Sequence, residues 1–293
     1  MLAVMGTVAL DTIALVERLP GRHETARVRE VREDFGGCAG NVAAALATLG
    51  LKPTLVSSAG RDFPKSDYGQ RLKRLGVHLD HLHFSDLPTS RAYLFTDPKG
   101  EQQIYYMPGA SVEMGRAPPF RAGLAHFAAG EIASYPEFMA RCQRVTFDPG
   151  QEIFHRDPED IRACLEHVDV LFLNEHELRW LGKALDMGIE DFLAAGPDVV
   201  VESRGPKGQT LHFAHERLTS PAAKARLTDP SGAGDAHRAG FLYGLARGHK
   251  LEACAKLGSV CAAFVLEAVG AQANLPTEAQ LRERYKREFG ALP

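Results

Sequence analysis

The sequence repeats one pattern along most of its length: a short apolar run, a turn residue, and a segment whose apolar side chains have helical spacing. This alternation is typical of a parallel sheet, because parallel strands need long crossover connections that helices supply. Strands are predicted at residues 3–9, 54–59, 125–129, 145–148, 170–173 and 199–202. Helices are predicted at residues 41–49, 67–75, 136–142, 158–167, 175–181, 234–247, 251–268 and 278–288. The expected fold class is therefore α/β, with a mostly parallel central sheet covered by helices.

Two stretches break this pattern. Residues 24–35 are charged and alternating, and residues 89–107 are typical of two strands around a turn at residues 97–100. The second stretch is rich in aromatic side chains, namely Tyr93, Phe95, Tyr105 and Tyr106. We interpret both stretches as a small β-sheet lid, formed by about residues 12–35 and 88–110. Since no repeat, low-complexity segment or long linker divides the chain, we expect a single domain over residues 1–293.

The composition excludes several classes of protein. Lys and Arg number 34 against 37 for Asp and Glu, so the chain lacks the basic excess that tracks nucleic acid. The apolar opening run at residues 2–10 is too short to span a bilayer and has no basic segment before it. The five cysteines are scattered without a C-x-x-C pair, which argues against a disulfide framework or a zinc site. We expect a cytoplasmic protein that binds neither nucleic acid nor membrane.

The first loop of chemical interest is Phe35-Gly36-Gly37-Cys38-Ala39-Gly40-Asn41, which leads directly into a predicted helix. Glycines let a backbone approach a ligand closely, and Asn41 can cap the helix or donate to a substrate oxygen. Ligands of parallel α/β sheets bind where such loops follow the strands. Taken alone, the segment is equally well explained as a tight turn and a helix cap.

The second loop is Asp229-Pro230-Ser231-Gly232-Ala233-Gly234-Asp235, at the start of a long predicted helix. Small residues at 232–234 leave backbone N–H groups bare at a helix N-terminus, which suits phosphate oxygens and the charge that develops during their transfer. Asp235 has two interpretations. It either compensates the helix dipole or accepts the proton of an attacking hydroxyl beside the phosphate site.

Together, the two loops resemble the two signatures of the ribokinase (PfkB) family of ATP-dependent sugar and nucleoside kinases. The resemblance covers the whole chain in the right order, and every fixed position of the D-x-x-G-A-G-D signature is present. It implies a ribokinase-like three-layer α/β/α sandwich with a small β-sheet lid. By contrast, the chain has neither a G-x-x-x-x-G-K-[ST] loop nor a G-x-G-x-x-G after the first strand.

The resemblance also implies roles on the side of the phosphate acceptor. Asp235 corresponds to the general base, and the anion hole for the γ-phosphate consists of Gly232, Ala233 and Gly234. Asp11 lies where the family has a carboxylate that binds two sugar hydroxyls. Substrate contacts are further implied for Gly36, Gly37 and Asn41.

On the nucleotide side, Asn174-Glu175-His176-Glu177 matches the family's N-x-x-E motif. The resemblance implies that Asn174 and Glu177 help to hold Mg²⁺ and phosphates, usually through water. Without the other motifs, a helix cap completed by Glu177 would be the preferred explanation. The segment 203–208 is similar to the T-x-G-x-x-G turn, which implies ATP contacts for Ser203, Gly205, Gly208 and, in the second signature, Asp229.

The chain departs from the family pattern at four positions. Pro230 stands where Thr is usual, and His237 stands where Phe is usual. Arg204 and Pro206 are atypical in the phosphate turn. None of the four removes a proposed catalytic group, but Pro230 bears on the coordination of a monovalent cation and His237 on the packing beneath the base.

The motifs do not fix the acceptor. Residues 103–111 and 258–272 resemble the bacterial and archaeal branch described as adenosine or nucleoside kinases. An aromatic lid suits a purine, although the same aromatic side chains can instead pack against one another or across a dimer. The preferred function is transfer of the γ-phosphate of ATP to a primary hydroxyl of a nucleoside such as adenosine. The alternatives are a sugar kinase for ribose, fructose or a related sugar, and a non-catalytic nucleotide-binding regulator.

The resemblance implies ATP and Mg²⁺ as cofactors and leaves a requirement for K⁺ open. The exposed edge of a lid sheet favours pairing with a second copy, so a homodimer through the lid is a further hypothesis.

Overall fold

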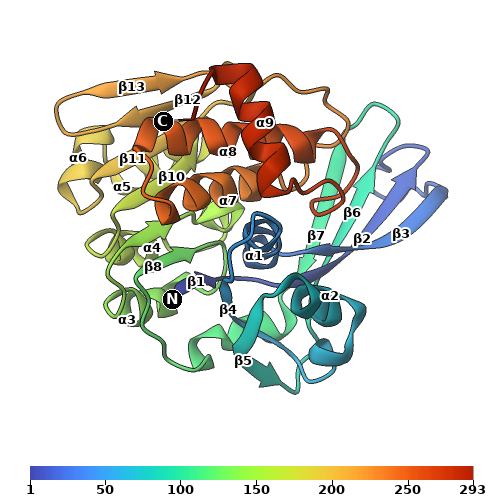
Figure 1. Ribbon diagram of the computed structural model, residues 1–293. Helices are drawn as coiled ribbons and strands as arrows, with labels where there is room; N and C mark the ends of the chain where they lie inside the picture. The colour runs from blue at the N-terminus through green and yellow to red at the C-terminus, as the bar shows by residue number, and fades with distance from the viewer. Residues whose placement is uncertain (293) are drawn as a thin grey trace.

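The computed structural model describes residues 1–292 and contains a nine-stranded central sheet (Figure 1). In spatial order its strands are β13 (Arg217–Ser220), β12 (Gln209–His212), β11 (Val199–Ser203), β10 (Val170–Asn174), β9 (Val145–Phe147), β8 (Leu124–Phe127), β1 (Leu2–Met5), β4 (Thr54–Gly60) and β5 (His78–Ser85). All neighbours from β11 to β5 pair in parallel, whereas β12 and β13 are antiparallel. The predicted mostly parallel sheet is confirmed.

Helices cover both faces of this sheet. One layer contains α1 (Cys38–Thr48), α2 (Asp67–Leu75), α7 (Ala233–Ala246), α8 (Leu251–Leu266) and α9 (Glu278–Phe289). The other contains α3 (Tyr135–Met139), α4 (Pro158–Leu165), α5 (Glu175–Leu185) and α6 (Ile189–Ala194). Short 3-10 segments lie at η1 (Phe63–Lys65), η2 (Gly109–Arg116), η3 (Ile132–Ser134), η4 (Gly150–Phe154) and η5 (Gly205–Lys207). The α/β/α sandwich is therefore confirmed.

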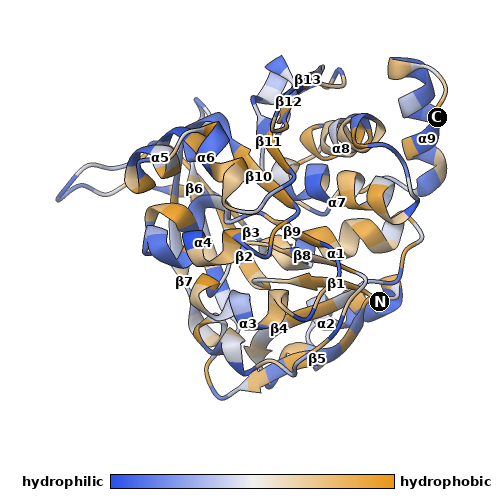
Figure 2. Cartoon of the chain, turned by 90° about the vertical axis from the view of Figure 1, so that its left-hand side faces the viewer, coloured by the Kyte–Doolittle hydropathy of each residue, from blue (hydrophilic) through white to orange (hydrophobic). Residues whose placement is uncertain are grey.

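Strand residues alternate between two hydrophobic cores. In β10, Val170 and Phe172 join the core under α7 and α8, while Leu171 and Leu173 join the core under α4 and α5. Side chains of a strand point alternately to opposite faces, so a strand covered on both faces must be apolar throughout. Figure 2 shows this pattern as mainly hydrophobic central strands and a more hydrophilic α9. Within residues 1–292, no helix is long and apolar enough to cross a membrane.

A second sheet stands to one side of the main body, with the order β3 (Val28–Gly36), β2 (Ala9–Val16), β6 (Ser90–Thr96) and β7 (Gln102–Met107) (Figure 1). The predicted hairpin within residues 89–107 is confirmed as β6 and β7. The single strand predicted at residues 3–9 is wrong, because β1 ends at Met5 and the chain enters the second sheet at Ala9. The carbonyl of Thr7 accepts hydrogen bonds from Ala39 and Gly40, which holds this connection against α1.

The sequence patterns missed several elements, namely β5, β12, β13, α6 and the 3-10 segments. β5 lies at the edge of the central sheet and carries three histidines, so it lacks the apolar run of a buried strand. β12 and β13 have only four residues each. Short or edge elements of this kind leave too little apolar periodicity to be predicted.

Candidate active site

Asp235 lies in the first turn of α7, where it meets the N-terminal part of α1. The amide Nδ2 of Asn41 donates a hydrogen bond of 2.8 Å to Oδ2 of Asp235. The two loops singled out in the sequence, which are 194 residues apart, thus contribute to one site.

The proton affinity of Asp235 is unusually high for an aspartate. Burial raises its pKa to about 6, and the charge of Asp148 adds to this increase. The hydrogen bond from Asn41 and the charge of Arg238 act in the opposite direction. A carboxylate with this pKa is ionised at neutral pH and is more basic than an exposed aspartate, as a general base requires.

The expected anion hole is only partly free. Gly232 precedes α7 with φ of +73°, and a Cβ at this position would lie 2.4 Å from Cβ of Ala271. The N–H of Ala233 donates to the carbonyl of Pro230 at 3.2 Å, so this amide already closes the turn. The N–H groups of Gly232 and Gly234 find no acceptor among residues 1–292. Two of the three expected donors therefore remain available for a ligand.

Asp11, in β2, approaches the loop of residues 35–41, which we call the acceptor loop. A Cβ on Gly36 would lie 2.1 Å from Oδ2 of Asp11, so only glycine lets the loop pass this carboxylate. Burial raises the pKa of Asp11 to about 7, with further increases from the charges of Asp34 and Asp235. Gly37 is the N-cap of α1, directly before the turn that carries Asn41. The structure thus brings Asp11, Gly36, Gly37 and Asn41 together.

Asn174 and Glu177 form a capping box at the start of α5. Oδ1 of Asn174 accepts from the N–H groups of His176 and Glu177 at 2.9 Å each, and Oε2 of Glu177 accepts from the N–H of Asn174 at 2.8 Å. Glu177 is only 4% exposed, and burial followed by the charge of Asp148 raises its pKa to about 7. The helix-cap interpretation is confirmed.

The carboxylates of Glu177 and Asp148 fit a magnesium ion that is held mainly by phosphates and water. Glu177 is buried, and the negative charge of the partly buried Asp148 helps to raise the pKa of its carboxyl group, a repulsion that a cation would relieve. Among residues 1–292, no group of three or more His, Cys, Asp or Glu side chains is arranged to hold a metal ion by itself. The donor set therefore fits hydrated Mg²⁺ carried with a nucleotide rather than a protein cage.

The predicted nucleotide turn lies between β11 and β12. Ser203 ends β11, and η5 spans Gly205–Lys207. The N–H of Arg204 donates to the carbonyl of Gly208 at 2.8 Å and closes the turn. Asp229 stands apart from this turn and links two backbone segments, accepting from the N–H of Ser231 at 2.9 Å and from that of Gly270 at 2.9 Å.

Sequence reasoning missed two charged residues beside Asp235, namely Asp148 and Arg238. Arg238 is 5% exposed and its Nε lies 2.8 Å from Oδ2 of Asp148. Asp148 directly follows β9, so its position at the carboxyl end of a parallel strand was the available indication. Arg238 lies one helical turn after Asp235, and no pattern in the sequence marks it.

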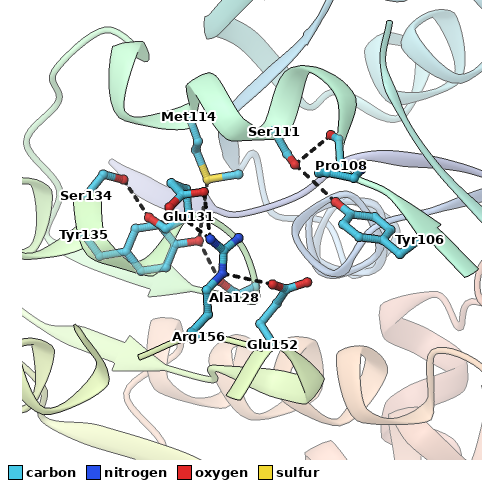
Figure 3. A network of polar contacts seen from close by, with 10 residues as sticks. All are labelled: Tyr106, Pro108, Ser111, Met114, Ala128, Glu131, Ser134, Tyr135, Glu152 and Arg156. Carbon is cyan, nitrogen blue, oxygen red and sulfur yellow. Dashed lines mark hydrogen bonds and ion pairs between the residues drawn. The ribbon is translucent and has the colours of Figure 1, made fainter. Parts of the chain in front are cut away.

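A network of polar contacts lies at the same edge of the sheet. Figure 3 shows Arg156 between Glu131, in the loop after β8, and Glu152, in η4 after β9. Nη1 of Arg156 lies 3.0 Å from both carboxylate oxygens of Glu131, and its Nε lies 3.1 Å from Oε2 of Glu152. Close by, the Tyr106 hydroxyl lies 3.2 Å from Oγ of Ser111. The charge of Arg156 is thus already paired with two carboxylates.

The structure shows the contacts of two of the departures, His237 and Pro230. Nε2 of His237 lies 2.8 Å from Oε1 of Gln209, and burial lowers the pKa of this histidine to about 3, so it packs as a neutral side chain. Pro230 supplies the carbonyl that accepts from Ala233. Neither residue displaces Asp235.

Known proteins resemble this chain in both sequence and fold. Residues 1–278 match the pfkB family of carbohydrate kinases. The nucleoside kinase of Methanocaldococcus jannaschii is 34% identical over 294 residues, covering 97% of this chain and 96% of that protein. A crystal structure of nucleoside kinase from that organism gives a TM-score of 0.91 at 32% identity, covering 98% of both chains. The Burkholderia thailandensis nucleoside kinase in complex with inosine gives 0.93 at 26% identity, covering 100% of this chain and 98% of that one. The chain therefore belongs to the pfkB family of carbohydrate kinases.

Proposed function

We propose that this protein transfers the γ-phosphate of ATP to the primary hydroxyl of a nucleoside. The observation that carries the proposal is the Asp235 carboxylate, held by Asn41 and next to the unpaired N–H groups at the start of α7. The relatives named nucleoside kinase support the choice of acceptor, as does the B. thailandensis enzyme solved in complex with ADP-inosine.

The proposed reaction needs one proton acceptor and a site for negative charge. Asp235 takes the proton of the acceptor hydroxyl while the phosphoryl group passes in line from ATP to the substrate oxygen. The amides of Gly232 and Gly234 donate to the equatorial phosphate oxygens. Asp11 binds sugar hydroxyls, and Asp229 keeps the segments before and behind the anion hole in place. Mg²⁺, when bound near Glu177 and Asn174, supplies charge neutralisation for the phosphates.

The register of the second sheet indicates which aromatic side chain faces the substrate. Asp34 pairs with Asp11, Asp11 pairs with Ala92, and Ala92 pairs with Tyr106, so these four residues share one face. Tyr93 and Tyr105 form the neighbouring pair and lie on the opposite face. Tyr105 packs against Phe95 with ring centroids 6.0 Å apart. We therefore assign Tyr106, and not Tyr105, to contact with the base, and we assign the sheet of residues 9–36 and 90–107 to the role of a lid.

One assay tests the proposal. The protein is incubated with ATP and Mg²⁺ and one acceptor at a time, taken from a set of purine and pyrimidine nucleosides, ribose and fructose, and the release of ADP is followed. We expect ADP release to depend on a nucleoside. Turnover with ribose or fructose alone would instead establish a sugar kinase, and nucleotide binding without any turnover would establish a regulator.

Other aspects of the proposal have separate tests. Activity in KCl against choline chloride tests the requirement for K⁺. Sedimentation tests the homodimer through the lid, for which the exposed apolar side chains of Val28, Val31 and Tyr105 provide contact surface. Fractionation of the source cells tests the cytoplasmic location.

A further inference from the structure

Gln272 connects Asp235, through Asn41, to Arg71, which is far away in the sequence. Its side chain is 3% exposed and lies in the segment between α8 and α9. Nε of Arg71, on α2, donates to Oε1 of Gln272 at 3.3 Å, and Nε2 of Gln272 donates to Oδ1 of Asn41 at 2.9 Å. Since Asn41 donates to Asp235 at 2.8 Å, the four side chains form one continuous path of hydrogen bonds.

The groups at the two ends fix the direction of this path. A guanidinium can only donate and a carboxylate can only accept. Gln272 must therefore turn its oxygen toward Arg71 and its NH₂ group toward Asn41, and Asn41 must turn its NH₂ group toward Asp235. A flipped Asn41 would place its carbonyl oxygen against the carboxylate. The network thus determines which amide orientation is stable.

The second hydrogen of the Gln272 amide anchors the acceptor loop. Nε2 also donates to the hydroxyl of Tyr68 at 2.8 Å, and that hydroxyl donates to the carbonyl of Gly36 at 2.9 Å. The backbone around Gln272 is held as well, since Nη2 of Arg71 donates to its carbonyl at 3.2 Å. Two residues earlier, Gly270 donates to Asp229. Gln272 is therefore fixed in space independently of Asn41.

We propose that Gln272 is a positioning residue, which fixes the orientation of the Asn41 amide so that Asn41 holds the Asp235 carboxylate toward the acceptor hydroxyl. The inference rests on the proposed role of Asp235 as the base. It assigns Asn41 a role in holding the base, in addition to the substrate contact expected from the sequence.

The orientation of the Asn41 amide affects the pH dependence of activity through the pKa of Asp235. Asp235 is surrounded by polar and charged groups of several elements, namely Asn41 and Cys38 of α1, Tyr68 of α2, Asp148 after β9, Asp11 of β2 and Arg238 of α7. The Asn41 hydrogen bond lowers the pKa of Asp235, whereas burial and Asp148 raise it. Loss of a correctly oriented Asn41 therefore raises the pKa, and the base becomes protonated at a higher pH.

The test uses the full-length protein and the variant Gln272→Met, which keeps the length of the side chain but removes its hydrogen bonds. We expect the acid limb of kcat/KM for the nucleoside to move upward by about one pH unit, with the KM for ATP unchanged. The matched control is Gln209→Met. Gln209 is 2% exposed and hydrogen-bonds His237 and the carbonyl of Ala255, so the acid limb stays in place.

A second variant guards against loss of folding. Arg71→Met removes the donor that orients Gln272 and leaves the buried amide in place, so we expect a shift of the same sign. If Gln272→Met does not fold, Arg71→Met decides the matter. An unmoved acid limb in the variants that fold overturns the inference. If Asp235→Asn also keeps wild-type turnover, the proposed role of Asp235 as the base is wrong as well. This variant therefore distinguishes failure of the Gln272 inference from failure of the proposed function.

Discussion

Nε of Arg238 lies 2.8 Å from Oδ2 of Asp148, and both charges of this ion pair act on the buried carboxyl groups of Asp235 and Glu177. Arg238 also stacks over the ring of Phe172, with 5.1 Å from its guanidinium carbon to the ring centroid. The charge of Asp148 raises the pKa of both carboxyl groups and that of Arg238 lowers both. The pair therefore balances the proton affinity of the proposed base.

Removing one partner at a time should move the acid limb of the activity profile in opposite directions. Asp148→Asn removes a neighbouring negative charge, so the pKa of Asp235 falls below its value of about 6 and activity persists to lower pH. Arg238→Met removes the positive charge, so the pKa rises and activity is lost at higher pH. The measurement is kcat/KM from pH 5 to 9 at saturating Mg²⁺.

Arg238→Lys is the control for this pair, because it keeps the charge and changes the shape. Each single variant leaves a buried charge unpaired, which costs about 3–5 kcal/mol, so thermal unfolding is measured alongside. Shifts of the same sign in Asp148→Asn and Arg238→Met would contradict the electrostatic explanation.

Asp235→Asn should abolish most of the activity and yet stabilise the fold at neutral pH. Loss of a general base costs about 10²–10⁴-fold in kcat, while ADP affinity measured by calorimetry should be retained. The stability effect follows from the sign of the pKa shift. The folded-state pKa of about 6 lies above the model value of 3.8, so the charged carboxylate is disfavoured in the folded protein.

Burial of the ionised Asp235 carboxylate lowers the free energy of unfolding above about pH 6. The effect is absent below pH 3.8, where the carboxyl group is protonated in both the folded and the unfolded state. Asparagine resembles the protonated form at every pH. The variant should therefore have the higher Tm at pH 7.5, by roughly 5–10 °C, and the difference should vanish as the pH falls toward 4. A lower Tm at pH 7.5 would show that Asp235 stabilises the fold.

The fold could be predicted from the sequence to the extent that its elements are buried on both faces. Val170 to Leu173 are apolar without interruption because two cores need them, and that run is visible without a structure. The turn at Gly6 was not visible in the same way. Val8 continues the apolar run because it packs under α1, so one strand was predicted where the chain changes sheets.

The candidate site was predictable where its residues lie in contiguous loops. Asn41 and Asp235 belong to such loops, but their hydrogen bond depends on the packing of α1 against α7, which local sequence does not contain. Arg238 and Gln272 act through contacts with residues far away in the chain. The occupied amide of Ala233 is a local detail, a turn closed onto the carbonyl of Pro230, which the pattern of small residues at 232–234 did not reveal.

Tyr106→Ala should weaken nucleoside binding much more than Tyr105→Ala does. The two residues are adjacent but point to opposite faces of the second sheet, and Tyr106 shares its face with Asp11. Base stacking is worth about 1–3 kcal/mol, so the KM for the nucleoside should rise by about 5- to 150-fold in Tyr106→Ala. The KM for ATP serves as the internal reference. Equal effects of the two variants would exclude stacking on Tyr106.

Glu177→Gln should raise the Mg²⁺ concentration needed for half-maximal activity. The amide oxygen of glutamine can still accept from the N–H of Asn174, so the helix cap is largely kept while the negative charge is lost. Glu175→Gln is the matched control, because Glu175 lies in the same first turn but outside the capping box. Titration of activity with MgCl₂ at fixed ATP makes the comparison. An unchanged requirement would remove Glu177 from the proposed magnesium site.

Gly232→Ala should reduce activity far more than its backbone strain alone explains. The residue has φ of +73°, and an added Cβ would lie 2.4 Å from Cβ of Ala271, so the loop must shift and carry the N–H groups of the anion hole with it. Loss of one such donor costs about 10²–10³-fold in kcat. We expect a decrease of this size, with a lower Tm.

Gly248→Ala is the control that distinguishes backbone strain from displacement of the loop. Gly248 has a similar φ of +76° at the other end of α7, but nothing lies within 4 Å of an added Cβ. Both variants pay the cost of a left-handed alanine, about 1–2 kcal/mol, and only Gly232→Ala collides with a neighbour. Steady-state kinetics and thermal unfolding of the two proteins are measured together. Wild-type kcat in Gly232→Ala would mean that the position of these amides does not matter for phosphate transfer.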